Sequence, residues 1–211
     1  MLWVSLLVEQ GRGDPAGVQA QARDLIELCQ REDIGFWLGG GRILHGWALA
    51  ELGQPAAGLA AIQQGLSDCE GGGAALIKPY YLALRAEALV RGGAVDAALE
   101  VITEALAVVQ RTGERWYEAE LFRLRGELRW QRGTTEIATV ETGLRQALAL
   151  ARRRRTRALE LRAAASLARL WRDQGRRRDA HALLAPVHAR FTEGFATADL
   201  QRARALLDEL A

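Results

Sequence analysis

The chain has 211 residues, of which 49% are hydrophobic and 26% are charged, a composition that argues against a disordered chain. Its two cysteines, Cys29 and Cys69, are too few and too scattered for a disulfide framework, so we expect reduced thiols in a cytoplasmic protein. The net charge of +2 conceals an asymmetry, because residues 1–110 sum to −6 and residues 111–211 to +8.

The chain opens with the apolar segment MLWVSLLV. It has no preceding basic stretch and no small-residue cleavage site, and it is too short to cross a bilayer, so we expect neither a signal peptide nor a membrane span. As a helix it would be apolar on nearly all sides, and such a helix is normally buried. We therefore expect that preceding repeats of a longer chain cover it. The alternative is self-association of two copies through this N-terminal helix.

Glycines then recur at a nearly constant interval. The interval from Gly53 to Gly93 equals that from Gly93 to Gly133, and Gly13 lies one such interval before Gly53. Gly175 follows Gly133 by the same interval plus two residues. Small residues flank each of the last four glycines, seven positions before and five positions after. They are Gly46, Ala86, Gly126 and Ala168, then Gly58, Ala98, Ala138 and Ala180. This pattern is typical of two antiparallel helices joined by a glycine turn and packed closely where side chains are small.

Apolar residues between the glycines follow helical spacing, as in Leu99, Ile102, Leu106 and Val109. In the third pair of the glycine series the second helix keeps the pattern only after a two-residue slip, at Ala147 and Leu148. The helix phase places Ala98 inside and Glu100 outside. We predict five helix pairs, at 1–33, 34–73, 74–113, 114–155 and 156–192, and a closing helix at 197–210 with Thr197 as its cap.

The predicted fold class is all-α: a tetratricopeptide-like α-solenoid that forms a single domain over 1–211. Several stretches resemble a known family, most clearly ERWYEAELFRLRGELRWQRG (114–133), LELRAAASLARLWRDQGRRRDAHALLAPV (159–187) and FTEGFATADLQRARALLDEL (191–210). They resemble the C-terminal tetratricopeptide region of bacterial signalling proteins that carry a class III adenylate/guanylate cyclase domain and an AAA-like ATPase domain. The resemblance implies a right-handed superhelix and a role in protein binding. It implies no catalytic residue here.

Two glycine clusters and two histidines each have a functional and a structural interpretation. Gly39–Gly41 and Gly71–Gly73 lack the strand, helix and lysine context of a phosphate loop, so we interpret the first as a frayed helix start and the second as a linker. His181 and His188 are seven residues apart, but no further ligands complete a metal set. We expect no metal and no cofactor.

Two arginine runs, Arg152–Arg155 with Arg157 and Arg176–Arg178, are the sharpest charge features. Both fall at predicted helix ends, where solvated cations offset the helix dipole. An acidic protein partner is the first alternative. Nucleic acid comes second, because no recognition motif accompanies the charge.

The first helices of such pairs line a concave groove in a solenoid. On that face the sequence places aromatic and charged residues, the types that anchor interfaces. These candidate partner-binding residues are Trp47, Tyr80, Glu87, Arg91, Glu120, Arg123, Glu127, Trp130, Arg162, Arg169 and Arg172. The arginines would make one end of the groove basic. The alternative for Trp47 and Trp130 is that they pack between repeats.

The sequence thus favours a scaffold that binds a peptide or protein. If the ligand contacts the basic end of the groove, we expect that ligand to be acidic. The alternatives are a regulatory arm acting on upstream cyclase or ATPase domains of the same polypeptide, and the effector arm of a transcriptional regulator. An enzyme is not expected, because no acid–base or nucleophile set is present.

Overall fold

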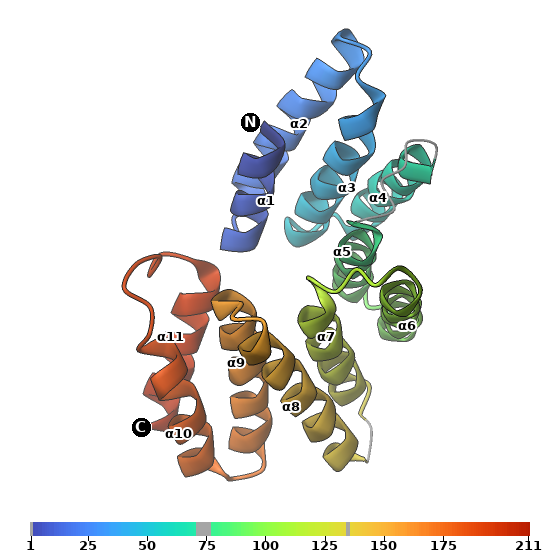
Figure 1. Ribbon diagram of the computed structural model, residues 1–211. Helices are drawn as coiled ribbons and strands as arrows, with labels where there is room; N and C mark the ends of the chain where they lie inside the picture. Colours follow the sequence, from blue (N-terminus) through green and yellow to red (C-terminus); the bar gives the residue numbers. More distant parts are fainter. Residues whose placement is uncertain (1, 71–76, 134–135) are drawn as a thin grey trace. The chain divides into compact units, whose positions relative to one another are not determined.

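A computed structural model describes residues 2–70, 77–133 and 136–211. Over these residues the protein is all-α, with eleven helices and no strand (Figure 1). This confirms the predicted number of helices. The cluster Gly71–Gly73 lies outside the described residues.

The helices belong to two compact units, Met1–Glu114 and Arg115–Ala211, called here the N-terminal and C-terminal units. The N-terminal unit contains α1 (Leu2–Arg12), α2 (Pro15–Arg31), α3 (Gly35–Glu51), α4 (Pro55–Glu70), α5 (Lys78–Arg91) and α6 (Val95–Thr112). The C-terminal unit contains α7 (Glu118–Gln131), α8 (Ile137–Arg153), α9 (Arg157–Asp173), α10 (Arg177–His188) and α11 (Ala198–Leu210). That both units form one continuous domain stays a prediction.

The recurring glycines form the turns inside the helix pairs, as predicted. Gly13, Gly53, Gly93, Gly133 and Gly175 all have φ between +73° and +85°, a conformation that side chains with a Cβ rarely adopt. At Gly53 the amide donates to the Ala50 carbonyl oxygen, and the next amide, of Gln54, donates to Leu49. These bonds satisfy carbonyl groups at the end of α3 and reverse the chain within a few residues.

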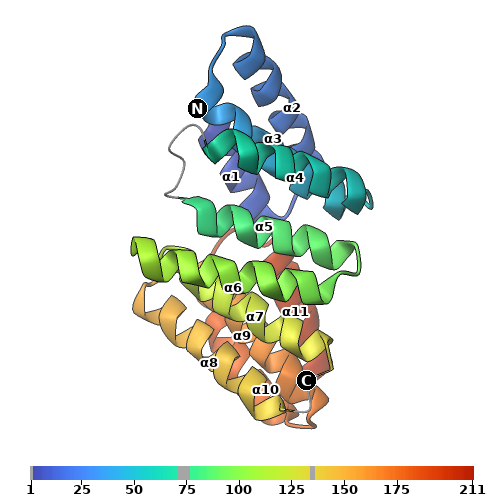
Figure 2. The ribbon, with the colours of Figure 1, turned by 90° about the vertical axis from the view of Figure 1, so that its right-hand side faces the viewer.

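In the pair formed by α3 and α4, backbone touches backbone (Figure 2). A Cβ added to Gly46 would lie 2.5 Å from the Gly58 carbonyl oxygen, and one added to Gly65 would lie 2.5 Å from the Gly39 carbonyl oxygen. Neither helix could carry a side chain at these crossings. The equivalent positions of the next pair are Ala86 on α5 and Ala98 on α6, which are both buried.

The expectation that Gly39–Gly41 fray the start of α3 is wrong. All three residues are buried inside the helix, beyond its first turn. A Cβ on Gly39 would strike α4, one on Gly40 would strike Trp3 and Tyr81, and one on Gly41 would press on Ile26 of α2. Successive residues of a helix point about 100° apart, so three consecutive glycines admit neighbours on three sides of α3. Tertiary packing here overrides a poor local helix propensity.

The pair α7–α8 departs from the predicted small-residue contact. Ala138 is exposed, whereas Ala98 and Ala180 are fully buried. The Cβ of an alanine at Gly126 would instead meet Leu144, 2.9 Å away, and the Val140 carbonyl oxygen. The reason is that α8 starts at Ile137, four residues after Gly133, while α6 starts two residues after Gly93. The two-residue shift of the small-residue pattern in this pair therefore corresponds to the later start of α8.

The helix phase and the closing helix agree with the prediction. Ala98 is fully buried and Glu100 is exposed. Thr197 holds the N-cap position of α11, although its side chain makes no capping hydrogen bond. The helix turns Arg202 and Asp208 to solvent and buries Leu200 and Leu206. Within the described part of the chain, every helix is too short or too polar to cross a membrane.

Gly58→Ala should destabilise the protein by about 1–3 kcal/mol, because the new methyl group forces α3 and α4 apart. Gly143→Ala is the matched control, since that helical glycine has nothing within 4 Å of an added Cβ. It should stabilise the protein by about 0.5–1 kcal/mol through lower chain entropy in the unfolded state. Urea unfolding followed by circular dichroism measures both. Equal effects of the two changes would contradict the backbone contact.

Candidate protein-binding face

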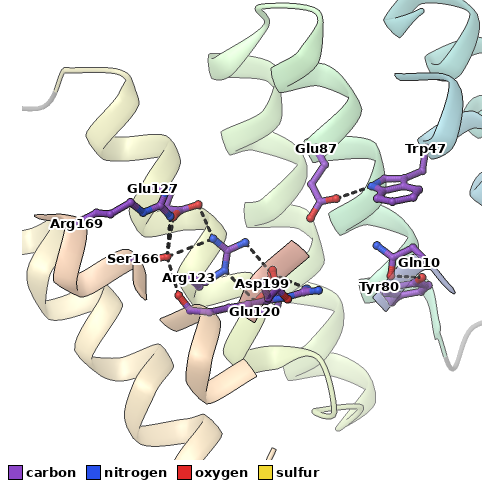
Figure 3. Close-up of polar contacts among 11 residues, drawn as sticks. Gln10, Trp47, Tyr80, Glu87, Glu120, Arg123, Glu127, Ser166, Arg169 and Asp199 are labelled. Carbon is purple, nitrogen blue, oxygen red and sulfur yellow. Dashed lines mark hydrogen bonds and ion pairs between the residues drawn. The ribbon is translucent and has the colours of Figure 1, made fainter. Parts of the chain in front are cut away.

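The eleven candidate residues all lie on the first helices of the pairs. Trp47 is on α3, and Tyr80, Glu87 and Arg91 are on α5 of the N-terminal unit. The C-terminal unit carries the other seven, on α7 and α9. Most of these side chains contact a side chain of another first helix (Figure 3). We call this set, with its contact residues, the ladder face of each unit.

In the N-terminal unit, two contacts join α3 to α5 at equivalent positions. The Trp47 indole Nε1 donates to Glu87 Oε2 at 2.7 Å, and Arg91 donates to both oxygens of Glu51 at 2.8 and 2.7 Å. The partners in each contact are one repeat period apart in the sequence. Trp47 is buried, so it packs between repeats, which is the alternative interpretation of this residue.

Tyr80 makes a contact over two repeats. Its hydroxyl donates to Gln10 Oε1 of α1 at 3.1 Å, and both side chains are buried (Figure 3). Since a buried amide and a buried hydroxyl are stable only when hydrogen-bonded, this pair fixes α5 against α1.

In the C-terminal unit, a fully buried carboxylate forms the centre of a charged network. Glu120 on α7 is 0% exposed. It accepts hydrogen bonds from Arg123 at 3.0 and 2.7 Å, and from Arg162 of α9 at 3.3 Å. Arg162 in turn donates to Asp199 of α11 at 2.5 Å. Three helices are thus joined through one buried chain of charges.

A second carboxylate, Glu127, lies two turns further along α7. It accepts from Arg123 at 2.5 Å, from the Ser166 hydroxyl at 2.6 Å, and from Arg169. Ser166 and Arg169 both belong to α9. Figure 3 shows Arg123 placed between the two glutamates.

The arginines expected to form a basic end are all paired with carboxylates. Arg162 meets Glu120 and Asp199, Arg169 meets Glu127, and Arg172 donates to Glu209 at 2.5 Å and to Asp173 at 2.9 Å. This part of the face is therefore charge-balanced rather than basic. Trp130 lies on the same helix as Glu127 and is partly exposed.

Burial and ion pairing oppose each other at these carboxylates. Burial by itself raises the pKa of Glu120, but the charges of Arg123 and Arg162 outweigh it and hold the pKa below its ordinary value. The pKa of Glu127 is lowered in the same way: burial raises it, and Arg123, Arg169 and the Ser166 hydroxyl more than compensate. Burial lowers the pKa of Arg162, but Glu120 and Asp199 together raise it well above its ordinary value. All three groups are charged at neutral pH.

Five contact residues were not found by sequence reasoning: Gln10, Glu51, Ser166, Asp199 and Glu209. The repeat period holds the signal for one of them, Glu51. Glu51 precedes Arg91 by one period, and Glu127 precedes Arg169 by the same interval that separates Gly133 from Gly175. Equivalent positions of successive first helices therefore face each other. Gln10 could not be found this way, because its partner Tyr80 does not lie at an equivalent position of the next repeat.

The arginine runs lie where the sequence predicted them, at helix ends. All four residues Arg152–Arg155 are exposed, and Arg152 and Arg154 pair with the buried carboxylates Glu160 and Glu118, at 3.0 and 3.4 Å. Arg176 pairs with Glu141 and also stacks on the Trp171 ring at 4.5 Å. In the described ranges no three His, Cys, Asp or Glu side chains are placed to hold a metal ion.

Arg162→Met should destabilise the protein by about 3 kcal/mol, because it leaves Glu120 buried with one arginine fewer. Arg204→Met is the control, since Arg204 forms an exposed pair with Asp208 within α11. That change should stay within about 0.5 kcal/mol of wild type. Denaturant unfolding measures the free energy of unfolding of both variants. Equal destabilisation by the two changes would mean that the buried pair stabilises the fold no more than the exposed one.

The pH dependence of Glu120 follows from its lowered pKa. Its contribution to stability is complete above the ordinary carboxyl pKa of about 4.3, and it is lost as the pH falls through the lower value in the folded state. The difference in free energy of unfolding between wild type and Glu120→Gln should therefore be constant above about pH 5 and shrink as the pH falls below about 4.3. The exposed Glu100→Gln should match wild type throughout. A constant gap for Glu120→Gln would contradict the pKa shift.

Comparison with known proteins adds one relative. No protein-family model matches the chain. The chain is similar to an uncharacterised protein of Rhizobium meliloti (strain 1021), with 33% identity over 146 residues. The matched residues make up 69% of this chain but 14% of the relative, so this chain spans only a small part of that protein's length.

Proposed function

We propose that the protein is a tetratricopeptide-like scaffold, a right-handed solenoid of helix pairs, that binds an acidic peptide or protein segment on its ladder face. One observation carries the proposal. In most of the cross-helix ion pairs of this face, the carboxylate is buried more deeply than its arginine, so guanidinium groups point outward.

The exposures of the paired side chains have this order in both units. Arg91 is 54% exposed and Glu51 19%, while Arg169 is 44% exposed and Glu127 25%. In the pair of Arg162 with Glu120, the arginine is again the more exposed side chain, although both are less exposed than in the other two pairs. Two pairs are exceptions: Glu209 is more exposed than Arg172, and Asp199, at 19%, is slightly more exposed than Arg162, at 17%. The outer edge of the face thus offers hydrogen-bond donors despite its balanced charge.

Fixed donors suit the capture of a flexible ligand. An arginine already held by a carboxylate loses little side-chain entropy on binding, and its remaining N–H groups are placed for a second acceptor. Partly exposed Trp130 adds an aromatic surface on the helix that carries Glu127. The partner that fits is an extended segment with Asp or Glu spaced to meet successive first helices. The proposal assigns no reaction to the chain.

A second candidate function is supported by the relative. There, the similar region is a small part of a much longer chain. The scaffold would then act as a regulatory arm that binds other domains of its own polypeptide, as the resemblance to cyclase–ATPase signalling proteins implies. A ligand segment within the same polypeptide would favour this candidate over a separate partner.

Selection of a displayed random peptide library on the full chain tests the ladder face. Enriched peptides should be acidic, and Arg91→Gln with Arg169→Gln should weaken their binding about tenfold or more. Arg145→Gln is the matched control: its side chain is also 54% exposed and paired with a glutamate, but it lies on the second helix α8. That variant should bind within about twofold of wild type.

Isothermal titration with purified variants measures these affinities, and thermal melts confirm that each variant is folded. Peptides without acidic residues, or equal losses for the control and the double variant, would refute the proposed face.

A further inference from the structure

The turn between α8 and α9 carries arginines that no carboxylate balances. Arg153, Arg155 and Arg157 are exposed, and none of them forms an ion pair with a residue that the structure describes. The helix dipoles do not account for them, because α8 ends and α9 begins within a few residues, and their termini carry opposite partial charges of about half a unit each. The positive charge of this turn is therefore available to a ligand.

Arg155 also has a backbone conformation that costs stability. Its φ is +56°, in the left-handed region, whereas the turn after α6 uses Gly113 in this conformation. A residue with a Cβ is less stable there than glycine, because the Cβ crowds the following carbonyl oxygen. The chain thus has a cation where glycine would fold more readily, and a local departure of this kind points to function.

Three ion pairs bring the ends of two further helices to this turn. Arg154 pairs with Glu118 at the start of α7, at 3.4 Å. Arg152, and Arg190 just after α10, both pair with Glu160 of α9 at 3.0 Å. The two carboxylates are buried and the arginines are exposed, so guanidinium groups form the outer surface. We call Arg152–Arg155, Arg157 and Arg190 together the arginine edge of the C-terminal unit.

Exposed aromatic rings lie on both sides of the arginine edge. Trp116, two residues before Glu118, is 41% exposed. Phe195, in the loop between α10 and α11, is 53% exposed, and the same loop carries the exposed carboxylate Glu193. Within this unit, the turn from α8 to α9 lies between the start of α7 and that loop (Figure 1). Protein interfaces have apolar side chains at the centre and charges at the rim. Here the order is reversed.

We propose that the arginine edge binds single-stranded nucleic acid without sequence preference. The phosphates lie on the arginines, whose planar N–H groups match phosphate oxygens, and bases stack on Trp116 and Phe195. Such binding needs no recognition motif, because every base has a flat face that can stack. An acidic polypeptide offers the negative charge but not the bases. This inference concerns a different surface and a different ligand from the ladder face, and it does not depend on that proposal.

A fluorescein-labelled strand of about 15 deoxythymidines serves as the probe, a length near the upper size of such sites. Its fluorescence anisotropy is followed while the full chain is added, at about 0.1 M salt and below. We expect saturable binding. Arg153→Gln, Arg155→Gln and Arg157→Gln together should weaken it about tenfold or more. The slope of log Kd against log salt concentration should also become shallower by about two, since each phosphate contact contributes about 0.7.

The matched control removes three exposed arginines from the opposite edge of the unit, where the glycine turns lie: Arg132→Gln, Arg177→Gln and Arg178→Gln. The change in net charge is the same. At about 0.1 M salt charges are screened beyond about 10 Å, so this variant should bind within about twofold of wild type. Thermal melts confirm that both variants are folded.

Two single changes separate binding from folding and charge from stacking. Arg155→Gly should raise the melting temperature and still weaken binding, because it relieves the left-handed conformation and removes a phosphate contact. Trp116→Ala should weaken binding about fivefold or more, because one base loses its stacking surface.

Four results would overturn the proposal. The first is the absence of saturable binding, and the second is equal weakening by the triple variant and its control. The third is unchanged binding after Trp116→Ala, which would leave nothing to distinguish nucleic acid from another polyanion. The fourth is displacement of the probe by poly-glutamate at a lower charge concentration than by the unlabelled strand, which would mean that the edge binds an acidic protein.

Discussion

The spacing between α3 and α4 is set by a contact of backbone with backbone. At Gly46 and Gly58, and again at Gly39 and Gly65, the main chains of α3 and α4 leave no room for a Cβ. Each such glycine weakens its helix by about 1 kcal/mol relative to alanine, so the packing it allows has to compensate. Close approach also lets α3 meet α1, α2 and α5 at once, through Gly40 and Gly41. The N-terminal unit is built around this helix.

Once the pair is this narrow, successive first helices come within side-chain reach at equivalent positions. The contacts of Trp47 with Glu87 and of Arg91 with Glu51 repeat the period of the sequence. In the C-terminal unit the same geometry is filled with buried charge around Glu120. Buried ion pairs add little net stability, but an unpaired buried charge is very unfavourable. We infer that the network favours the register in which α7, α9 and α11 pair these charges.

The helices could be predicted from the sequence because their signals are local and repeated: a turn glycine, small residues at fixed offsets and helical apolar spacing. Packing across pairs could not. Gly39–Gly41 were misjudged because helix propensity describes one segment, whereas their burial depends on three neighbouring helices. Glu120 is a charged residue between Ala119 and Leu121 in the sequence, and only the fold shows it fully buried. The contacts of Arg91 with Glu51 and of Trp47 with Glu87 could have been predicted, because they join equivalent positions of successive first helices.

The late start of α8 shows where the repeat tolerates a change of length. Two additional residues lie between Gly133 and α8, and the next turn glycine, Gly175, comes later by the same number of positions. The first helix α9 nevertheless meets α7 through Glu127 and Ser166. The longer connection changes which residues of α8 face Gly126, and the contacts between the first helices α7 and α9 are kept. Evolution of such a chain can therefore vary its second helices in length and sequence while its first helices keep their order.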